Sequence, residues 1–484
     1  MGVVSLEVSY TILAIQIAIF TLMGYYVGKK FVKTSEDFLV AGRRLPWFGL
    51  AGSIIVTWIW ASTVLASGEA AYVWGFPAIW IYPISGISLA TLLPVFKILR
   101  REVPKGITFL DYISMKFGRA THLLALIITI LITAITIFYV FLGLGFGLEP
   151  ILGVPWWQLM LIGGLTVVLY SWFGGLWSSV LTDIIQYSIV WILTTVAILL
   201  SLNSIGGIGA LYEGLLSKGI TKGIALLTSD AYAYYFLPIV GWIFYAMIDQ
   251  TIWQRVYALK EEKDLSKMLV FAWIGWSFYP MVAGIAGLIA LYLGLELEVG
   301  SLAFPMVIAK LTPIWISIAF CFIVFNAVLS TLDSLLCGMT ALIVDDLYIK
   351  YVAHGPPSEK TVYKLSKVTI VAAGLILMVL TMLFPASIMF VGLYLSAFLA
   401  SLSFPLVIGI LLPKKNRWAV FTAILINIIL TLTLWTATYF GYIKEIAGVK
   451  LESWAVLLLM IAISSVIEVC WSYAKPEEVR GGKS

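Results

Sequence analysis

The chain has 484 residues, of which 62% are hydrophobic and only 11% are charged, and its mean hydropathy is +1.04. Soluble domains are about 45–50% apolar and about 25% charged, so a fold in water could not cover this much apolar surface. The net charge of +5 is small, and no basic stripe interleaved with aromatic residues occurs, which argues against a nucleic-acid partner. The composition predicts an all-α polytopic membrane protein in a lipid bilayer.

Apolar stretches long enough to cross a bilayer recur from near the N-terminus almost to the C-terminus. A spanning helix needs about 20 mostly apolar residues, and the length and continuity of these runs exclude a transmembrane barrel. We predict thirteen spans, at roughly residues 8–28, 46–73, 76–97, 121–147, 157–174, 177–201, 233–253, 268–295, 313–344, 367–386, 388–412, 418–442 and 453–474.

The basic residues alternate between the two sides of these spans. Cytoplasmic loops collect Lys and Arg during insertion, and one set of alternate segments, which includes Arg255, holds most of the 30 basic residues. We therefore predict a cell-membrane protein with its N-terminus outside and its C-terminus in the cytoplasm. The outer set holds only Lys218, Lys222, Lys310, Lys444 and Lys450.

Helix 2 of this prediction contains Gly52, Gly68 and many other small residues, and Gly75 follows just after its end. Discontinuous helices in transporters expose carbonyl groups at the membrane midplane, where they bind ions and solutes. Small residues also let helices pack closely, and composition alone does not separate these two roles. A broken helix 2 is therefore one of two expectations.

A weak internal symmetry supports a repeat. Tyr82-Pro83 in helix 3 and Tyr279-Pro280 in helix 8 both precede a run of small residues. If helices 2–6 and 7–11 are two copies, each has five spans and the copies lie in opposite orientations. The expected parts are helix 1 with its cytoplasmic linker (1–45), a first repeat (46–201), an extracellular loop with the second repeat (202–412), and peripheral helices with a tail (413–484).

We single out four acidic residues at membrane depth, where a charged side chain costs roughly 2.5–3.5 kcal/mol on insertion scales. Glu69 lies in helix 2, Asp183 near the start of helix 6, and Asp333 within helix 9. Glu468 lies near the inner end of helix 13 and is expected to reach the interface by snorkelling. Asp183 is a candidate either for an ion site or for capping helix 6.

Helix 9 carries the densest group of polar residues. Ser330, Asp333 and Ser334 stand at i, i+3 and i+4, which is one face of a helix, and Thr331 lies on an adjoining edge. Oxygen ligands on one face suit a small hard cation. Hydrogen bonding between helices is the alternative, although that role needs no charged residue such as Asp333.

The sequence offers little for catalysis. Cys321, Cys337 and Cys470 have no pairing or metal-ligand spacing and are expected to pack, and only two histidines occur, His122 and His354. No GxxxxGK[ST] loop is present, which argues against an ATP-driven pump. We do not expect an enzyme.

Four ordered motifs resemble those of the sodium:solute symporter family. They are SEDFLVAGRRLPWFGL after helix 1, GGLWSSVLTDIIQ at helix 6, WQRVYALKEEKDLSK after helix 7 and AVLSTLDSLLCGMTALIVDDLYIK in helix 9. The resemblance covers nearly the whole chain and implies a LeuT-type core built from the inverted five-helix repeat. It also implies a transporter that carries sodium, and residues from helices 2 and 9 that would bind it.

The resemblance implies two cation sites. The first uses carbonyl and hydroxyl groups of Val56, Ile59, Ala327, Ser330 and Thr331. The second, found in some members of the family, maps onto Asp183, Ser330, Asp333 and Ser334. Asp333 departs from the family pattern, where serine is more frequent, and this departure favours either a stronger cation site or a proton-linked one.

The solute is less clear. Segments of helices 2 and 3 and the TFLDYISMKFGRATHL segment are similar to the urea-permease branch, whereas helix 9 is closer to the proline and pantothenate branches. Aromatic residues at membrane depth are also common in simple packing. The candidates for a solute pocket are Trp58, Trp60, Ser62, Thr63, Glu69, Trp242 and Tyr245.

We therefore expect sodium-coupled symport of a small polar solute, such as urea, an amino acid like proline, or a pantothenate-like molecule. In this mechanism sodium orders helix 2, raises the affinity for solute, and the core then opens to the other side. Each ligand must tighten the other by the same factor. Coupling to protons through Asp333, Asp183 or Glu69 and a passive polar channel are the alternatives.

Overall fold

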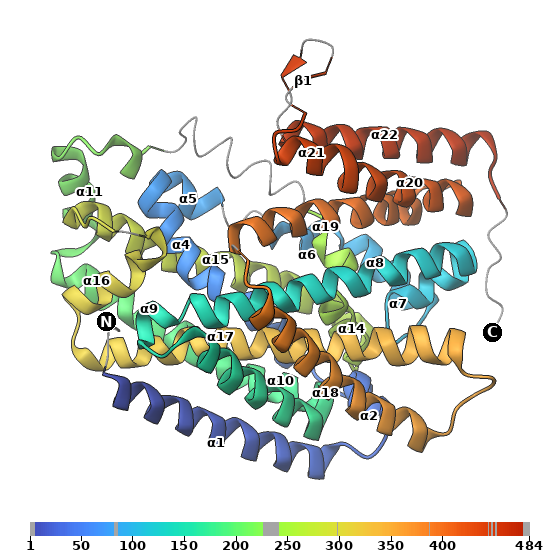
Figure 1. Cartoon of the computed structure of the whole chain (residues 1–484), viewed down its shortest axis with the longest axis horizontal. Helices are drawn as coiled ribbons and strands as arrows, with labels where there is room; N and C mark the ends of the chain where they lie inside the picture. The colour runs from blue at the N-terminus through green and yellow to red at the C-terminus, as the bar shows by residue number, and fades with distance from the viewer. Residues whose placement is uncertain are drawn as a thin grey trace.

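The computed structural model describes residues 5–81, 86–225, 242–297, 299–386, 388–443, 445–446, 449–450 and 453–477. This part of the chain is almost entirely helical, and its long helices lie side by side (Figure 1). Within it, nine helices are long and apolar enough to cross a membrane, and one bent pair raises that number to ten. The prediction of a multi-pass, all-α membrane protein is confirmed.

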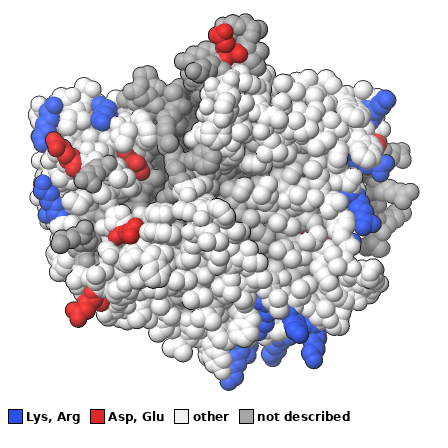
Figure 2. All heavy atoms as spheres, in the orientation of Figure 1, with Lys and Arg blue, Asp and Glu red and all other residues white. Residues whose placement is uncertain are grey.

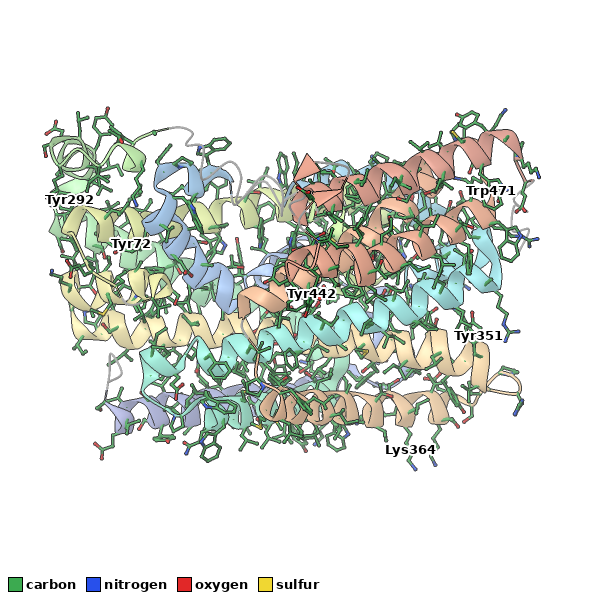
Figure 3. The ribbon with its side chains drawn as sticks, turned by 45° about the horizontal axis from the view of Figure 1, so that its top comes forward. Tyr72, Tyr292, Tyr351, Lys364, Tyr442 and Trp471 are labelled. Carbon is green, nitrogen blue, oxygen red and sulfur yellow. The ribbon has the colours of Figure 1, made fainter. Side chains whose placement is uncertain are left out.

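Charged side chains gather toward the ends of these helices. Figure 2 shows Lys, Arg, Asp and Glu near the edges of one face, with a broad uncharged area between them. Tyr72 and Tyr292 lie at one end of the molecule, and Tyr351 and Lys364 lie at the other (Figure 3). An uncharged belt of this kind is the surface that lipid tails cover.

The element α10 (Trp156–Ser204) is too long to be one span. Its 49 residues would extend about 73 Å as a single helix, more than twice the roughly 30 Å hydrocarbon core of a bilayer. Gly175 interrupts the element with φ 50° and ψ −136°, a backbone conformation that favours glycine. Residues 156–174 and 176–204 therefore form two limbs.

The two limbs run in opposite directions. Ser204 Oγ donates to the carbonyl of Leu311, just before α17 (Ile314–Ala341), while Ser179 Oγ donates to Asp333 farther along α17, so the second limb is antiparallel to α17. The first limb lies against α18 (Glu359–Leu383), with Gly164 near the end of α18 at Met378. Helix α18 runs antiparallel to α17, and the first limb runs antiparallel to α18, so the first limb is parallel to α17. The two limbs of α10 therefore match the two spans predicted at 157–174 and 177–201.

Helix 2 is broken, but not at a glycine. Helices α3 (Trp47–Trp58) and α4 (Ala61–Trp74) meet at an angle of 56°. Between them Ile59 has φ −84° and ψ 87°, and Trp60 has φ −79° and ψ 165°, so neither is helical. The break therefore lies between Gly52 and Gly68 and directly precedes Ala61, the first residue of α4.

Two other predicted spans appear as shorter pieces. The span at 76–97 contains α5 (Phe76–Ile81), α6 (Ser88–Thr91) and α7 (Leu93–Glu102), and the span at 233–253 ends in α13 (Tyr245–Ile248) and α14 (Gln250–Ala258). Tyr82-Pro83 lies outside the described residues, and so does 226–241. The number thirteen therefore stays a prediction.

The other elements complete the bundle around this core. They are α1 (Leu6–Phe31), α2 (Ser35–Val40), η1 (Ala41–Arg43), α8 (Leu110–Phe146), α9 (Glu149–Leu152), α11 (Gly207–Ser217), η3 (Thr221–Gly223), η4 (Glu262–Asp264), α15 (Leu265–Leu293), η5 (Gly300–Leu302), α16 (Ala303–Leu311), the π-helical η6 (Leu342–Val352), α19 (Ile388–Leu411), α20 (Arg417–Leu430), η7 (Thr431–Trp435), α21 (Thr436–Tyr439), β1 (Glu445–Ile446), β2 (Val449–Lys450) and α22 (Ser453–Ala474).

Glu468 corrects a prediction. Its side chain is fully buried, and neither carboxylate oxygen has a hydrogen-bond partner among the described residues, so it does not snorkel to the interface. The reason is packing, because a Cβ added to Gly409 of α19 would lie 2.9 Å from Glu468 Oε1. Helix α22 thus turns this residue toward its neighbours.

Candidate cation and solute sites

The break in helix 2 lies against the polar face of α17. Thr331 Oγ1 lies 2.9 Å from the carbonyl oxygens of both Thr57 and Ala327 and can donate to either. Thr57 is the next-to-last residue of α3, so the break deprives its carbonyl of the N–H partner that a continuous helix would supply. The Thr57 carbonyl, which also accepts from the Trp60 indole N–H at 3.1 Å, therefore meets the Thr331 hydroxyl at a buried position.

The residues of the first predicted sodium site lie at or beside this contact. Val56 and Ile59 flank Thr57 and are fully buried, and the Ile59 N–H donates to the Val56 carbonyl at 3.0 Å. Ser330 and Thr331 are buried on the facing side of α17. Thr57 itself was missed by the sequence analysis, although its place between two predicted carbonyl donors could have indicated it.

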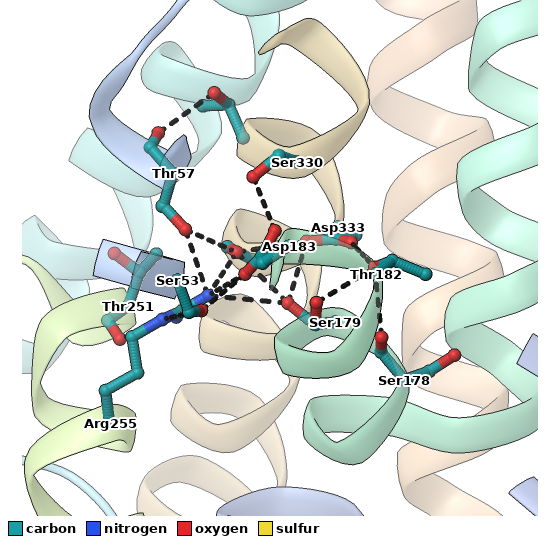
Figure 4. Close-up of polar contacts among 12 residues, drawn as sticks. Ser53, Thr57, Ser178, Ser179, Thr182, Asp183, Thr251, Arg255, Ser330 and Asp333 are labelled. Carbon is teal, nitrogen blue, oxygen red and sulfur yellow. Dashed lines mark hydrogen bonds and ion pairs between the residues drawn. The ribbon is translucent and has the colours of Figure 1, made fainter. Parts of the chain in front are cut away.

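The four residues of the second predicted site are also together, and Figure 4 labels three of them, Asp183, Ser330 and Asp333. Ser330 Oγ donates to Asp183 Oδ1 at 2.5 Å, and Ser334 Oγ donates to Asp333 Oδ1 at 3.0 Å. Asp183 lies inside the second limb of α10 and accepts hydrogen bonds from side chains, among them that of Ser53. It therefore does not cap helix 6.

Asp333 sits among hydroxyl groups. It accepts hydrogen bonds from Tyr170 at 2.7 Å and from Ser179 at 2.8 Å, and Thr182 Oγ1 lies 3.4 Å away. Both limbs of α10 thus contribute donors, since Tyr170 precedes Gly175 and the other two follow it. The reversal at Gly175 is what wraps α10 around this carboxylate.

Arg255 is the main residue that the sequence analysis misplaced. It was counted among cytoplasmic basic residues, but its side chain is fully buried and its Nη2 lies 2.8 Å from Asp183 Oδ2. Counting loop charges could not reveal this, because Arg255 follows an apolar run by only a few residues and α14 turns inward. The available signal was Asp183 itself, because a carboxylate at membrane depth needs a basic partner, and this need could have indicated Arg255.

Most of the candidate solute residues form one aromatic cluster. The rings of Trp58 and Tyr245 stack with centroids 5.4 Å apart, and Trp242 contacts both Trp60 (5.7 Å) and Tyr245 (5.1 Å) edge-on. Tyr139 of α8 adds a further contact with Trp60 at 5.6 Å. The cluster surrounds the break in helix 2.

A second break meets the first at this cluster. Asp249, with φ −80° and ψ 99°, separates α13 from α14, and its Oδ2 accepts from the indole N–H of Trp58 at 2.7 Å. Its Oδ1 accepts from the backbone N–H of Thr251. Each candidate repeat therefore contributes one broken helix, and the hydrogen bond between Trp58 and Asp249 joins the two breaks.

The remaining candidates divide. Thr63 is buried and accepts from the backbone N–H of Trp60, so it holds the start of α4. Glu69 lies farther along α4 against Gly300, away from the aromatic cluster, because a Cβ on that glycine would lie 2.8 Å from Glu69 Cγ. The side chain of Ser62 lies outside the described residues.

A second acidic cluster lies where α17 continues into η6. Ligand oxygens of Asp111, Asp345 and Asp346 lie within 4.8 Å of one another, which is close enough to hold a metal ion. Lys350 Nζ takes that place, at 2.6 Å from Asp111 and 2.5 Å from Asp346. His122 Nε2 lies 2.9 Å from Asp346. The lysine makes this an ion-pair cluster rather than a metal site.

Comparison with known proteins places this arrangement in a family. The model of the Sodium:solute symporter family matches residues 38–427. The sodium/pantothenate symporter of Escherichia coli is 23% identical over 94% of this chain and 96% of its own, and the urea-proton symporter DUR3 of Oryza sativa is 22% identical over 96% and 70%. The probable urea active transporter 1 of Schizosaccharomyces pombe is 23% identical over 68% of this chain but only 54% of its own length.

A solved structure of a Na+-coupled sialic acid symporter in an outward-open state shares the fold. It superimposes with a TM-score of 0.81 at 17% identity and covers 97% of this chain and 98% of its own. The fold is therefore that of a LeuT-like symporter. Together with the family match over most of its length, this shows that the chain belongs to the sodium:solute symporter family.

Proposed function

We propose that the protein is a sodium-coupled symporter of a small polar solute that works by alternating access, in a cell membrane, with thirteen spans, its N-terminus outside and its C-terminus in the cytoplasm. The observation that carries this proposal is the contact between the Thr331 hydroxyl and the Thr57 carbonyl at the break in helix 2. Sodium prefers such hard oxygen ligands. It would enter between Val56, Ile59, Ala327, Ser330 and Thr331.

Coupling to solute follows from the neighbouring residues. Trp58 is the last residue of α3, and its side chain stacks on Tyr245 and bonds to Asp249. An ion that orders the carbonyls of residues 56–59 also fixes the indole ring of Trp58 at the edge of the aromatic cluster. Sodium and solute then strengthen each other's binding, as linkage requires.

Proton coupling is the second candidate, and Asp333 favours it. A carboxylate at membrane depth without a basic partner of its own can carry a proton or a sodium ion. The family includes relatives of both kinds by name, sodium/pantothenate and urea-proton symporters.

Uptake into proteoliposomes separates these mechanisms. Radiolabelled urea, proline and pantothenate are offered under an inward sodium gradient, under an inward proton gradient without sodium, and with neither gradient. We expect accumulation above equilibrium only with the sodium gradient. Accumulation driven by the proton gradient alone would show that the coupling ion is the proton and not sodium. Equilibration without accumulation in all three conditions would indicate a passive channel.

A further inference from the structure

Arg255 stands in the middle of the second predicted cation site. Its Nη2 lies 2.8 Å from Asp183 Oδ2 and 2.7 Å from Ser334 Oγ, and its Nε donates to Ser53 Oγ at 2.7 Å. Figure 4 shows the guanidinium reaching between α3, α10 and α17. The hydroxyls that it contacts are the ligands that a sodium ion beside Asp183 would need.

We propose that Arg255 is a built-in cation that fills the Asp183 half of this site, so that the site takes up one exchangeable cation fewer than its two carboxylates would otherwise bind. The inference deepens the proposed sodium-coupled function and rests on it. Arg255 is the one basic side chain within ion-pair distance of Asp183 or Asp333 in the described part of the chain. Two carboxylates and one guanidinium leave a single negative charge.

The hydrogen bonds decide which carboxylate stays available. Asp183 is paired directly with Arg255, whereas Asp333 is reached only through hydroxyls that bridge the two. Ser334 Oγ lies 2.7 Å from the guanidinium and 3.0 Å from Asp333, and Ser179 Oγ lies 3.4 Å from the first and 2.8 Å from the second. Asp333 is therefore the carboxylate that receives the remaining monovalent cation, a sodium ion or a proton.

A purely structural ion pair is the competing explanation. Buried ion pairs often serve only the fold, and breaking one strands an unpaired charge. Such a pair would affect stability without changing how many sodium ions the protein binds. The number of bound ions therefore distinguishes the two explanations.

The test is equilibrium binding of radioactive sodium to the purified full-length protein in detergent. Arg255→Gln should bind one more sodium ion per chain than the wild type, because two carboxylates and at least four hydroxyls are left without a cation. The double variant Arg255→Gln, Asp183→Asn removes both charges of the pair and should return to the wild-type number. Equal numbers in all three proteins would overturn the proposal.

Two further outcomes are decisive. If Arg255→Gln cannot be recovered folded, Asp183→Asn decides at pH 7.5, because Arg255 would then neutralise Asp333 and the protein should bind one sodium ion fewer than the wild type, whereas an unchanged number would overturn the proposal. If the wild type binds no sodium while Arg255→Gln binds one ion, the built-in cation stands and the sodium-coupled function fails. Repeating the binding at pH 5.5 and 7.5 distinguishes a proton from sodium at Asp333.

Discussion

Two acidic clusters lie along α17 and its continuation η6, one paired with Arg255 and the other with Lys350 and His122, and they differ in their contact with water. Asp333 in the middle of α17 is fully buried, and so are Asp183 of α10 and Arg255 of α14, which lie beside it. At the η6 end, the side chain of Lys350 is 25% exposed and that of Asp111 is 18% exposed. Water and salt screen charges in the second cluster but hardly reach the first.

This contrast is the reason that we propose ion coupling for the buried cluster and not for the η6 cluster. When the net charge of a buried site changes by one unit, an ion or a proton must bind or leave to neutralise it, because an unpaired charge costs far more free energy when buried than when exposed. In the η6 cluster, Lys350 ties the start of α8 to the end of the helix that carries the proposed cation sites. We therefore expect substitutions in the buried cluster around Asp333 to change sodium affinity, and substitutions in the η6 cluster around Lys350 to change the stability of the fold.

The largest expected effect is on stability at the η6 cluster. Lys350→Met leaves three neighbouring carboxylates without their lysine and should lower the free energy of unfolding by on the order of 3 kcal/mol, the lower end for a broken buried pair because this one is partly exposed. Thermal unfolding of the purified protein measures this. Lys364→Met, at the same end but exposed and without an ion pair among the described residues, is the control and should unfold like the wild type.

The next effect is on sodium affinity. Thr331→Ala removes one hydroxyl ligand and leaves the carbonyls in place, so the sodium concentration for half-maximal binding should rise about tenfold, equivalent to about 1.4 kcal/mol. Thr340→Ala is the matched control, because Thr340 is buried on the same element and bonds to the carbonyl of Leu336. A similar rise in both variants would argue against a site at Thr331.

A smaller effect concerns pH. We expect a proton to compete with sodium at Asp333, so sodium affinity should fall severalfold from pH 7.5 to 5.5 in the wild type, and Asp333→Asn should abolish this dependence. The ionisable groups around Asp333 are Tyr170 and Asp183 of α10, Arg255 of α14 and Cys337 of α17 itself.

Sodium-binding curves at the two pH values provide the measurement, with Glu468→Gln as a control for a buried carboxylate elsewhere. If Asp333→Asn kept the full wild-type dependence, another of these groups would carry the proton. If Asp183→Asn alone abolished it, the two carboxylates would titrate as one coupled pair.

The smallest effect is expected at Glu69. Because this residue lies against Gly300 rather than in the aromatic cluster, Glu69→Gln should change both the solute and the sodium half-saturation by less than about twofold, the range of most exposed or peripheral substitutions. Concentration dependence of uptake measures both values. A tenfold loss of solute affinity would instead indicate that Glu69 belongs to the solute site, as the sequence predicts.

The sequence was most informative where local spacing determines proximity. The i, i+3 and i+4 spacing of Ser330, Asp333 and Ser334 placed them on one face, and the structure brings that face to Asp183. Contacts that depend on how chain segments bend were harder to predict. Arg255 enters the site because α14 begins at the break at Asp249, and no local pattern around either residue indicates that break.

The most direct test compares the two clusters through one quantity, the sodium concentration for half-maximal equilibrium binding, measured side by side in Ser330→Ala and Lys350→Met. Ser330 joins the first predicted sodium site to Asp183, whereas Lys350 belongs to the η6 cluster. We predict a rise of about tenfold for Ser330→Ala and an unchanged value for folded Lys350→Met. An unchanged value for Ser330→Ala with a rise for Lys350→Met would place sodium at the other cluster and contradict the account.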